Sequence, residues 1–160
     1  MVRQTLDTPE ELLRFQLRTA LTMEHDSLAA LGELANAAKS AEIKKLFRHH
    51  ADETKEQIAN LRQAFELLGY KESTAPSQST KGISKQAVSL LERSAPKLRD
   101  QVAVSSALGN EHYEISAYQG LILPAAAQGL GDVVTLLQAN LDQETHTSEE
   151  LRSTLEKLVG

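Results

Sequence analysis

The chain has 160 residues, of which 41% are hydrophobic and 24% are charged. This is the balance of a globular chain of about one domain rather than of a disordered one. Seventeen basic and 22 acidic side chains give a formal net charge of -5, and there is no cysteine. A broad nucleic-acid-binding surface is therefore not expected, and disulfides, thiolate metal sites and cysteine nucleophiles are excluded. Because the sequence shows neither a signal-peptide pattern nor an apolar run of membrane length, we predict a cytoplasmic protein without a membrane partner.

The first half of the sequence predicts two long helices joined by a short turn. Residues 8–11 (TPEE) provide a capping hydroxyl, a proline at the first helical position and a glutamate that can close a capping box. An apolar stripe with helical spacing then continues to about Lys39. Ser40 can cap a second helix, which we expect to end at Gly69, a residue suited to the left-handed conformation after a helix.

The middle of the sequence predicts a connection that contains a short helix. Residues 70–82 are rich in hydroxyl side chains and hold one proline and one glycine, so we expect no regular element there. A short helix at residues 83–93 should follow. From Pro96, which is tolerated only in the first turn of a helix, a third long helix is predicted to run to about Gln128.

A fourth long helix is predicted from the next turn to the C-terminus. The segment at residues 129–132 (GLGD) should end the third helix and cap the fourth. The predicted fold is therefore all-α: a four-helix bundle of two antiparallel hairpins in a single domain over residues 1–160. The hairpins are joined by a long crossover at about residues 70–95 that contains the short extra helix.

Each long helix carries a glutamate at a position that the helical period assigns to the core. These residues are Glu24, Glu53, Glu111 and Glu144. With a rise of about 1.5 Å per residue, each hairpin brings its two glutamates to similar depths, so four carboxylates should converge on one layer. Such a layer costs several kcal/mol unless the groups are protonated or joined by cations. Hard oxygen ligands favour a divalent metal ion, so the pattern predicts a metal site.

Two further residues, His50 and Glu114, are candidates to complete the ligand set. His50 precedes Glu53 by three residues on the same face, although it could equally be a core histidine that is hydrogen-bonded to a carbonyl or carboxylate. Glu114 competes with Ile115 for the core-facing position, and Gln57 is expected to be a hydrogen-bonding neighbour rather than a ligand. The alternative to a metal site is a buried polar layer that fixes the helix register without any ion.

The two predicted hairpins also carry a weak internal repeat. EHDSLAAL at residues 24–31 is similar to EHYEISAY at residues 111–118, and DET at residues 52–54 is similar to QET at residues 143–145. A pseudo-twofold relation would place two glutamates from each half about a central axis. Over nearly its whole length the sequence resembles the YciE/YciF-like stress proteins of the ferritin-like superfamily, most specifically in HADETKEQ at residues 50–57 and in EHYEISAY.

The resemblance implies a ferritin-like four-helix bundle, often a homodimer, with a di-iron or di-manganese site. If two metals bind, bridging carboxylates would hold them close enough to react with oxygen or peroxide, as in an oxidase or a detoxifying centre, but the sequence assigns no reaction. Dimetal carboxylate bundles usually carry Glu-x-x-His on two helices, whereas here Glu53 is followed at that spacing by Glu56, and Glu144 by Thr147. The site would therefore be rich in oxygen ligands, with at most one imidazole. The competing hypothesis is a metal-free helical scaffold that acts through self-association or partner binding.

Overall fold

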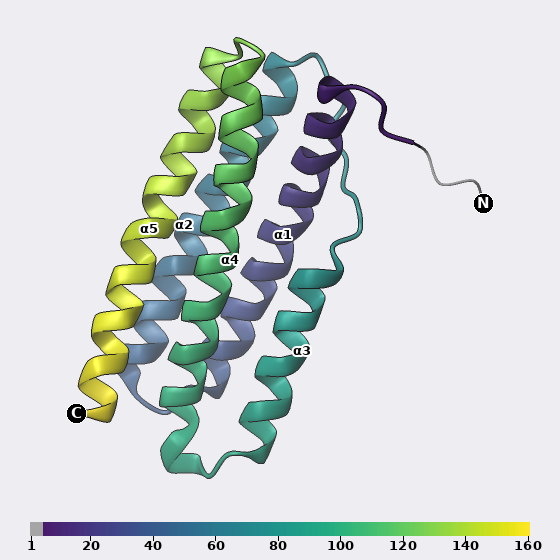
Figure 1. The fold of residues 1–160 in the computed structure, drawn as a ribbon. Coiled ribbons are helices and arrows are strands. Elements are labelled where there is room, and N and C mark those ends of the chain that lie inside the picture. Colours follow the sequence, from purple (N-terminus) through teal and green to yellow (C-terminus); the bar gives the residue numbers. More distant parts are fainter. Residues whose placement is uncertain (1–4) are drawn as a thin grey trace.

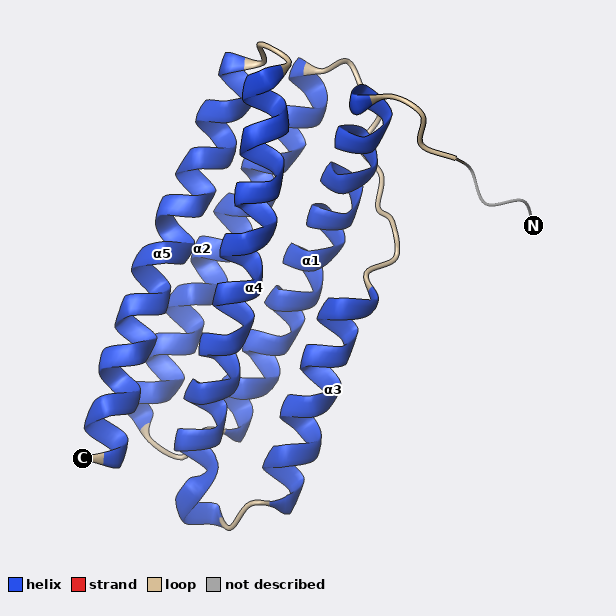
Figure 2. Cartoon of the chain, in the orientation of Figure 1, coloured by secondary structure: helices blue, strands red, loops and turns tan. Residues whose placement is uncertain are grey.

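Five α-helices and one short 3₁₀ helix make up the fold in a computed structural model that describes residues 5–160 (Figures 1 and 2). The elements are α1 (Pro9–Ala37), α2 (Ala41–Leu67), α3 (Gln78–Arg93), η1 (Pro96–Leu98), α4 (Arg99–Ala127) and α5 (Gly131–Val159). Helices α1 and α2 form one antiparallel hairpin and α4 and α5 the other, while α3 packs on the outside against α1 and α4. The prediction of an all-α bundle of two hairpins with a helix in the crossover is confirmed.

Side-chain caps define where the helices of the first hairpin begin. The Thr8 hydroxyl accepts a hydrogen bond from the Glu11 amide, and the Glu11 carboxylate accepts one from the Thr8 amide, which is the predicted capping box. Ser40 caps α2 as predicted. The turn between α1 and α2 is tied to the other hairpin, because the Asp100 carboxylate accepts hydrogen bonds from the amides of Lys39 and Ser40 at 2.6 and 3.0 Å.

The crossover is more ordered than the sequence suggested. Helix α3 begins at Gln78 rather than at residue 83, because the Ser77 side chain accepts a hydrogen bond from the Thr80 amide and starts the helix there. The hydroxyl-rich segment was therefore wrongly predicted as irregular up to residue 82. The segment before α3 is held on α1, where the amide of Ala75 donates to the Arg18 carbonyl at 3.2 Å.

The starts of the last two long helices also differ from the prediction. Pro96 begins the 3₁₀ helix η1, and regular α4 starts only at Arg99. At the next turn Gly129 adopts φ of +72°, a conformation that favours glycine, and ends α4. The segment at residues 129–132 was expected to cap α5, but α5 begins at Gly131 without a side-chain cap, and Asp132 lies in its first turn.

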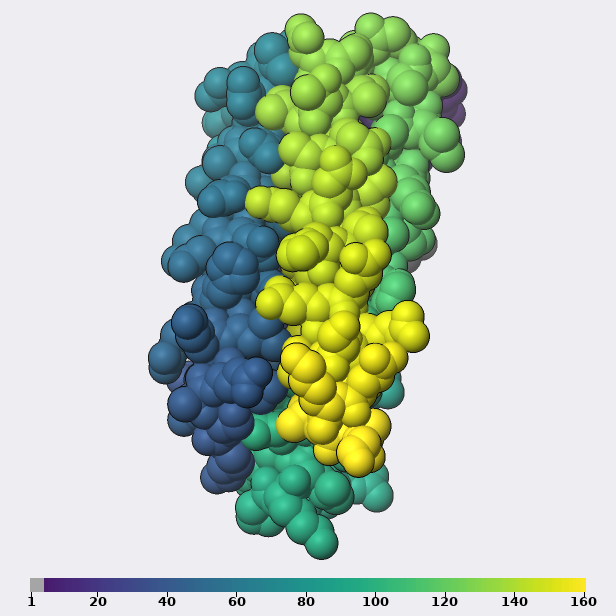
Figure 3. Space-filling model, turned by 90° about the vertical axis from the view of Figure 1, so that its left-hand side faces the viewer, coloured from purple at the N-terminus to yellow at the C-terminus, as the bar shows by residue number. Residues whose placement is uncertain are grey.

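The interior consists of two apolar clusters, one towards each end of the bundle. The first includes Leu17, Leu21, Leu61, Phe65, Leu121 and Leu137. The second includes Leu31, Leu34, Ile43, Phe47, Val104 and Leu151. Helix α5 packs between α2 and α4 along one face of the molecule (Figure 3). Within residues 5–160 no helix is both long and apolar enough to span a bilayer. Polar side chains of the four long helices lie between the two clusters, and they form the candidate site.

The burial of Phe47 generates a stability prediction. Phe47 is fully buried in the second cluster, so Phe47→Ala should lower the free energy of unfolding by about 3–5 kcal/mol through lost transfer energy and a residual cavity. Urea denaturation followed by circular dichroism measures this change. Leu123→Ala is the control, because Leu123 is 72% exposed and its truncation should change stability by no more than about 0.5 kcal/mol. Equal effects of the two substitutions would contradict this packing.

Candidate metal centre

Four glutamates from three helices meet in the polar layer. Glu24 comes from α1, Glu111 and Glu114 from α4, and Glu144 from α5, and each is no more than 3% exposed. We call these four residues the carboxylate cluster. Ligand oxygens of Glu24, Glu114 and Glu144 all lie within 4.8 Å of one another. That spacing suits a shared cation, because ions bound by oxygen ligands have bond lengths of about 2.0–2.6 Å.

Helical register explains why α4 supplies two members of the cluster. Glu111 and Glu114 are three residues apart, so both side chains project from the same face of α4. The neighbouring Ile115 is only half-buried, which resolves the competition between Ile115 and Glu114 in favour of the glutamate. Glu111 is joined to the rest of the cluster by a side-chain hydrogen bond with Glu144.

Burial and like charge oppose ionisation of the cluster. Desolvation raises the pKa of Glu24 to about 8, against the opposing effect of its hydrogen bond from Tyr118. For Glu111, Glu114 and Glu144, desolvation is again the largest cause, and repulsion from neighbouring carboxylates adds to it, so their pKa values lie well above the ordinary value. Neutral protonated groups can coexist at this spacing, whereas four bare carboxylates could not.

Each carboxyl of the cluster has one oxygen without a hydrogen-bond partner. These atoms are Glu24 Oε2, Glu111 Oε2, Glu114 Oε1 and Glu144 Oε1. Unpartnered buried oxygens are costly, and they are rare in folded proteins. Four of them in one layer form a donor set for a hard cation, so the residues present fit a metal ion chemically.

The second oxygen of Glu24 is held by a chain of side chains from three helices. Tyr118 Oη donates to Glu24 Oε1. Asn140 Nδ2 donates to Tyr118 Oη at 2.9 Å, and Asn60 Nδ2 donates to Asn140 Oδ1 at 2.8 Å. The Gln57 carbonyl also accepts from Asn140 Nδ2, at 3.1 Å. This chain fixes the orientation of Glu24 and leaves its other oxygen free for the cluster.

Sequence reasoning missed Asn140, Ser27 and Asn110 as neighbours of the cluster. Asn140 precedes Glu144 by four residues and is fully buried, so it lies one helical turn away on the same face of α5. Asn110 Nδ2 donates to Ser27 Oγ at 3.1 Å, and hydrogen bonds from both side chains oppose the rise in the pKa of Glu114. The detectable signal was a small polar residue one turn from a core glutamate.

His50 and Glu53 form a separate pair beside the cluster. His50 Nδ1 lies 3.0 Å from Glu53 Oε2, which also accepts a hydrogen bond from Thr147 Oγ1 at 3.2 Å. Desolvation raises the pKa of Glu53, but hydrogen bonding and attraction from His50, together with His49 and Thr147, outweigh it and lower the pKa overall. The negative charge of Glu53 contributes to the raised pKa values in the cluster. The structure therefore brings four of the six predicted ligands together and places His50 and Glu53 next to them.

His50 has a buried nitrogen that this pair does not use. The residue is 2% exposed, and its Nε2 atom has no hydrogen-bond partner, although Glu150 Oε2 lies 3.6 Å away. Glu56, at the position where dimetal bundles carry histidine, is exposed and accepts a hydrogen bond from Gln143 at 2.9 Å. Among the buried residues that the structure describes, His50 is therefore the one that could offer an imidazole nitrogen to a cation in this layer.

The raised pKa of Glu24 predicts how the stability of the metal-free protein depends on pH. With a pKa of about 8 in the fold and 4.5 as the ordinary value, the folded state binds more protons than the unfolded state between these values. The contribution of Glu24 is fully present below pH 4.5 and is lost as the pH rises through 8. Thermal melts in the presence of a chelator should therefore show a falling Tm from pH 5 to pH 8, by roughly several degrees.

Glu24→Gln should reduce the decrease in Tm between pH 5 and pH 8, because the amide cannot ionise. Glu149→Gln is the matched control, since Glu149 is an exposed residue of α5 and its replacement should leave the slope unchanged. A slope that is the same in all three proteins would contradict the buried acid as its source.

Comparison with known proteins identifies the family. The family described as a domain of unknown function (DUF892) matches residues 8–160. The protein YciF of Escherichia coli K12 is 26% identical over 148 residues, which cover 91% of this chain and 89% of YciF.

Solved structures agree with that match. YcfI from Rhodopseudomonas palustris superposes with a TM-score of 0.91 at 30% identity, covering 95% of this chain and 98% of YcfI. The E. coli stress protein YciF gives a TM-score of 0.91 at 26% identity, covering 96% of this chain and 98% of YciF. A protein from Xanthomonas campestris pv. campestris shares the fold at 24% identity, with a TM-score of 0.78 over 95% of this chain and 94% of that one. The chain is therefore a YciF-like protein and belongs to the DUF892 family.

Proposed function

We propose that this protein binds iron or manganese ions through the carboxylate cluster and acts in a stress response. The observation that carries the proposal is the set of four unpartnered buried oxygens, one on each glutamate of the cluster. A divalent cation would displace the carboxyl protons. It would also attract all four carboxylates, which would otherwise repel one another. The similarity to the E. coli stress protein YciF supports the proposed role in a stress response. Because the sequence resembles the YciE/YciF-like proteins, we also propose that the protein is a cytoplasmic homodimer.

Glu24, Glu114 and Glu144 would hold the first ion, with Glu111 completing the shell through its free oxygen. A second ion would need Glu53, and His50 could add an imidazole nitrogen. Glu53 must first leave its hydrogen bonds to His50 and Thr147, so we expect the second ion to bind more weakly than the first.

The residues around the cluster prepare it for ion binding. Glu24 and Glu144 are buried between apolar side chains, which excludes bulk water and strengthens attraction to a cation. Tyr118 and Asn140 hold Glu24 in one orientation. Bound ferrous ion would supply electrons to dioxygen or to peroxide, the chemistry of an oxidase or of a detoxifying centre.

Metal titration tests the first ion site. Anaerobic addition of ferrous or manganous ion should raise the Tm of the protein, because a ligand that binds only the folded state stabilises it by mass action. Glu144→Gln should remove this rise and should also raise the Tm of the metal-free protein near neutral pH, because an amide does not carry the free-energy cost of keeping a buried acid protonated. Differential scanning calorimetry measures both effects.

The control for this titration is Glu149→Gln, which changes an exposed glutamate of the same helix and should keep the full metal-induced rise. No rise in the unmutated protein, with either ion, would favour the competing hypothesis of a metal-free scaffold with a purely structural polar layer.

The stoichiometry of binding tests the role of Glu53. Isothermal titration calorimetry of the unmutated protein should resolve a stronger and a weaker step. Glu53→Gln should weaken the second step by roughly tenfold or more, as expected when one charged ligand is lost, and should leave the first nearly unchanged. Equal weakening of both steps would show that Glu53 belongs to the first site.

A further inference from the structure

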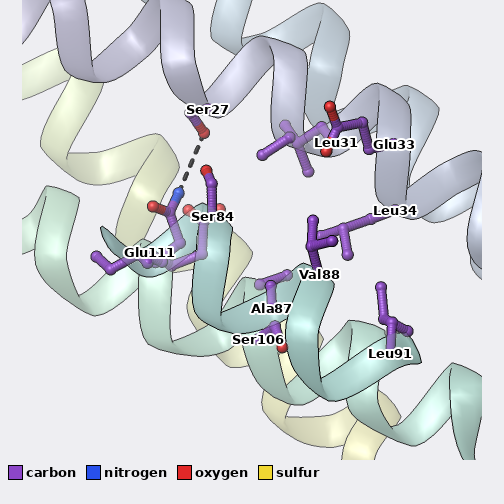
Figure 4. A pocket seen from close by; sticks show the side chains of 14 residues that line it. Ser27, Leu31, Glu33, Leu34, Ser84, Ala87, Val88, Leu91, Ser106 and Glu111 are labelled. Atoms are coloured by element: carbon purple, nitrogen blue, oxygen red, sulfur yellow. Dashed lines mark hydrogen bonds between the residues drawn. The ribbon is translucent and has the colours of Figure 1, made fainter. Parts of the chain in front are cut away.

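A small apolar cavity lies beneath α3 and reaches the carboxylate cluster. Its volume is about 40 Å³, and it lies between α1, α3 and α4. Most of its wall is aliphatic, with Leu31 and Leu34 from α1 and Ala87, Val88 and Leu91 from α3. Figure 4 shows these apolar side chains towards one side of the pocket, with Ser27, Ser84 and Glu111 at the other.

The polar end of the cavity leads directly to the cluster. Glu111 lines the cavity and is itself a member of the cluster. Ser27 and Asn110 also line it, but they are hydrogen-bonded to each other at 3.1 Å (Figure 4). Because a buried water needs two to four polar partners, the aliphatic part of this cavity is suited to an uncharged molecule rather than to water or a hydrated ion.

The cavity has a mouth on the surface and a lightly held cover. Glu33, Ser84 and Val88 also line a shallow depression on the outside of the molecule, so the cavity opens there. Thr80 is the one residue of α3 that is fully buried, and its hydroxyl donates to Asp26 Oδ2 at 2.6 Å. A helix held by so few buried side chains can separate from α1 locally at low cost.

We propose that this cavity binds dioxygen and leads it to the carboxylate cluster. The volume accommodates a molecule of two heavy atoms, the aliphatic lining selects for an uncharged one, and the inner end stops at Glu111. The identity of the ligand rests on the proposed function, because dioxygen is the small apolar molecule that a ferrous centre would consume. Cations would enter from the opposite side, where Glu53 is partly exposed next to His49.

Dioxygen itself is the probe, because it is paramagnetic and enhances the relaxation of nearby methyl protons. NMR of the metal-free protein under oxygen pressure should show a several-fold larger enhancement for the methyl group of Ala107 than for those of Ala64 and Ala125. All three alanines are buried, but only Ala107 lines the cavity. Equal enhancement at the three methyl groups would overturn the proposal.

Two variants should fill the cavity from two different helices. Ala87→Leu fills it from α3, and Ser106→Val fills it from α4. Both should reduce the enhancement at Ala107 to the level of Ala125, whereas Gln86→Leu, at an exposed position next to Ala87, should not. Ala87→Leu could instead detach α3 from the bundle, and faster hydrogen exchange of the α3 amides would reveal this. Ser106→Val is included because it fills the cavity without changing α3. Retention of the enhancement in Ser106→Val would overturn the proposal.

A second measurement connects the cavity to the cluster. In protein loaded anaerobically with ferrous ion, Ser106→Val should slow oxidation by dissolved oxygen several-fold and leave the affinity for the ion unchanged. An unchanged oxidation rate would overturn the delivery of dioxygen through this cavity. Failure of ferrous ion to bind would refute the proposed function alone, because the relaxation experiment judges the cavity in the metal-free protein.

Discussion

The burial of four carboxyl groups in one layer is the constraint on which the structure depends. Glu24, Glu111, Glu114 and Glu144 lie between two apolar clusters, where desolvation and mutual repulsion oppose their ionisation. The fold tolerates this layer because aliphatic side chains on both sides bury enough surface to offset it. Natural proteins accept such local instability mainly where function needs it. Protons neutralise the layer in the absence of metal, and a cation is the other species that could do so.

The two oxygens of Glu24 illustrate how the chain prepares the layer. One oxygen accepts from Tyr118, which is itself held by Asn140 and, through it, by Asn60. The other has no partner. The side chain therefore does not need to reorient when its proton is exchanged for a cation, and this lowers the entropic cost of binding. Glu53 differs, since His50 and Thr147 both contact its Oε2 atom and His49 Nε2 lies 3.6 Å from its Oε1 atom.

Helical spacing and local signals were sufficient to predict the bundle, because α1 and α2 begin at side-chain caps and Gly129 ends α4. The start of α3 was missed because Ser77 and Thr80 resemble loop residues until their hydrogen bond is known. The period also predicted that Glu24, Glu111 and Glu144 face inward, whereas Glu53 is only half-buried. The period could not predict the contact between Glu53 and His50. From the sequence, Glu53 could face either the other glutamates or the histidine on its own helix. The hydrogen bond from Thr147 on α5, which holds Glu53 beside His50, is visible only in the structure.

The internal repeat relates the cavity to a second pocket between α1 and α4, whose wall includes Ala20, Met23, Ala117 and Leu121 and no residue of α3. In the alignment of residues 24–31 with residues 111–118, Ser27 corresponds to Glu114 and Leu31 corresponds to Tyr118. At these two points α4 therefore places a charged or larger side chain where α1 places a small or apolar one. Ser27 and Leu31 both line the cavity, whereas Glu114 and Tyr118 fill the interior. Helix α3 covers the first of these two pockets and contributes no residue to the second. The divergence of the two halves thus gives the layer a polar side at α2 and α5 and an apolar side beneath α3, which is the asymmetry that a centre taking a cation and an uncharged gas would require.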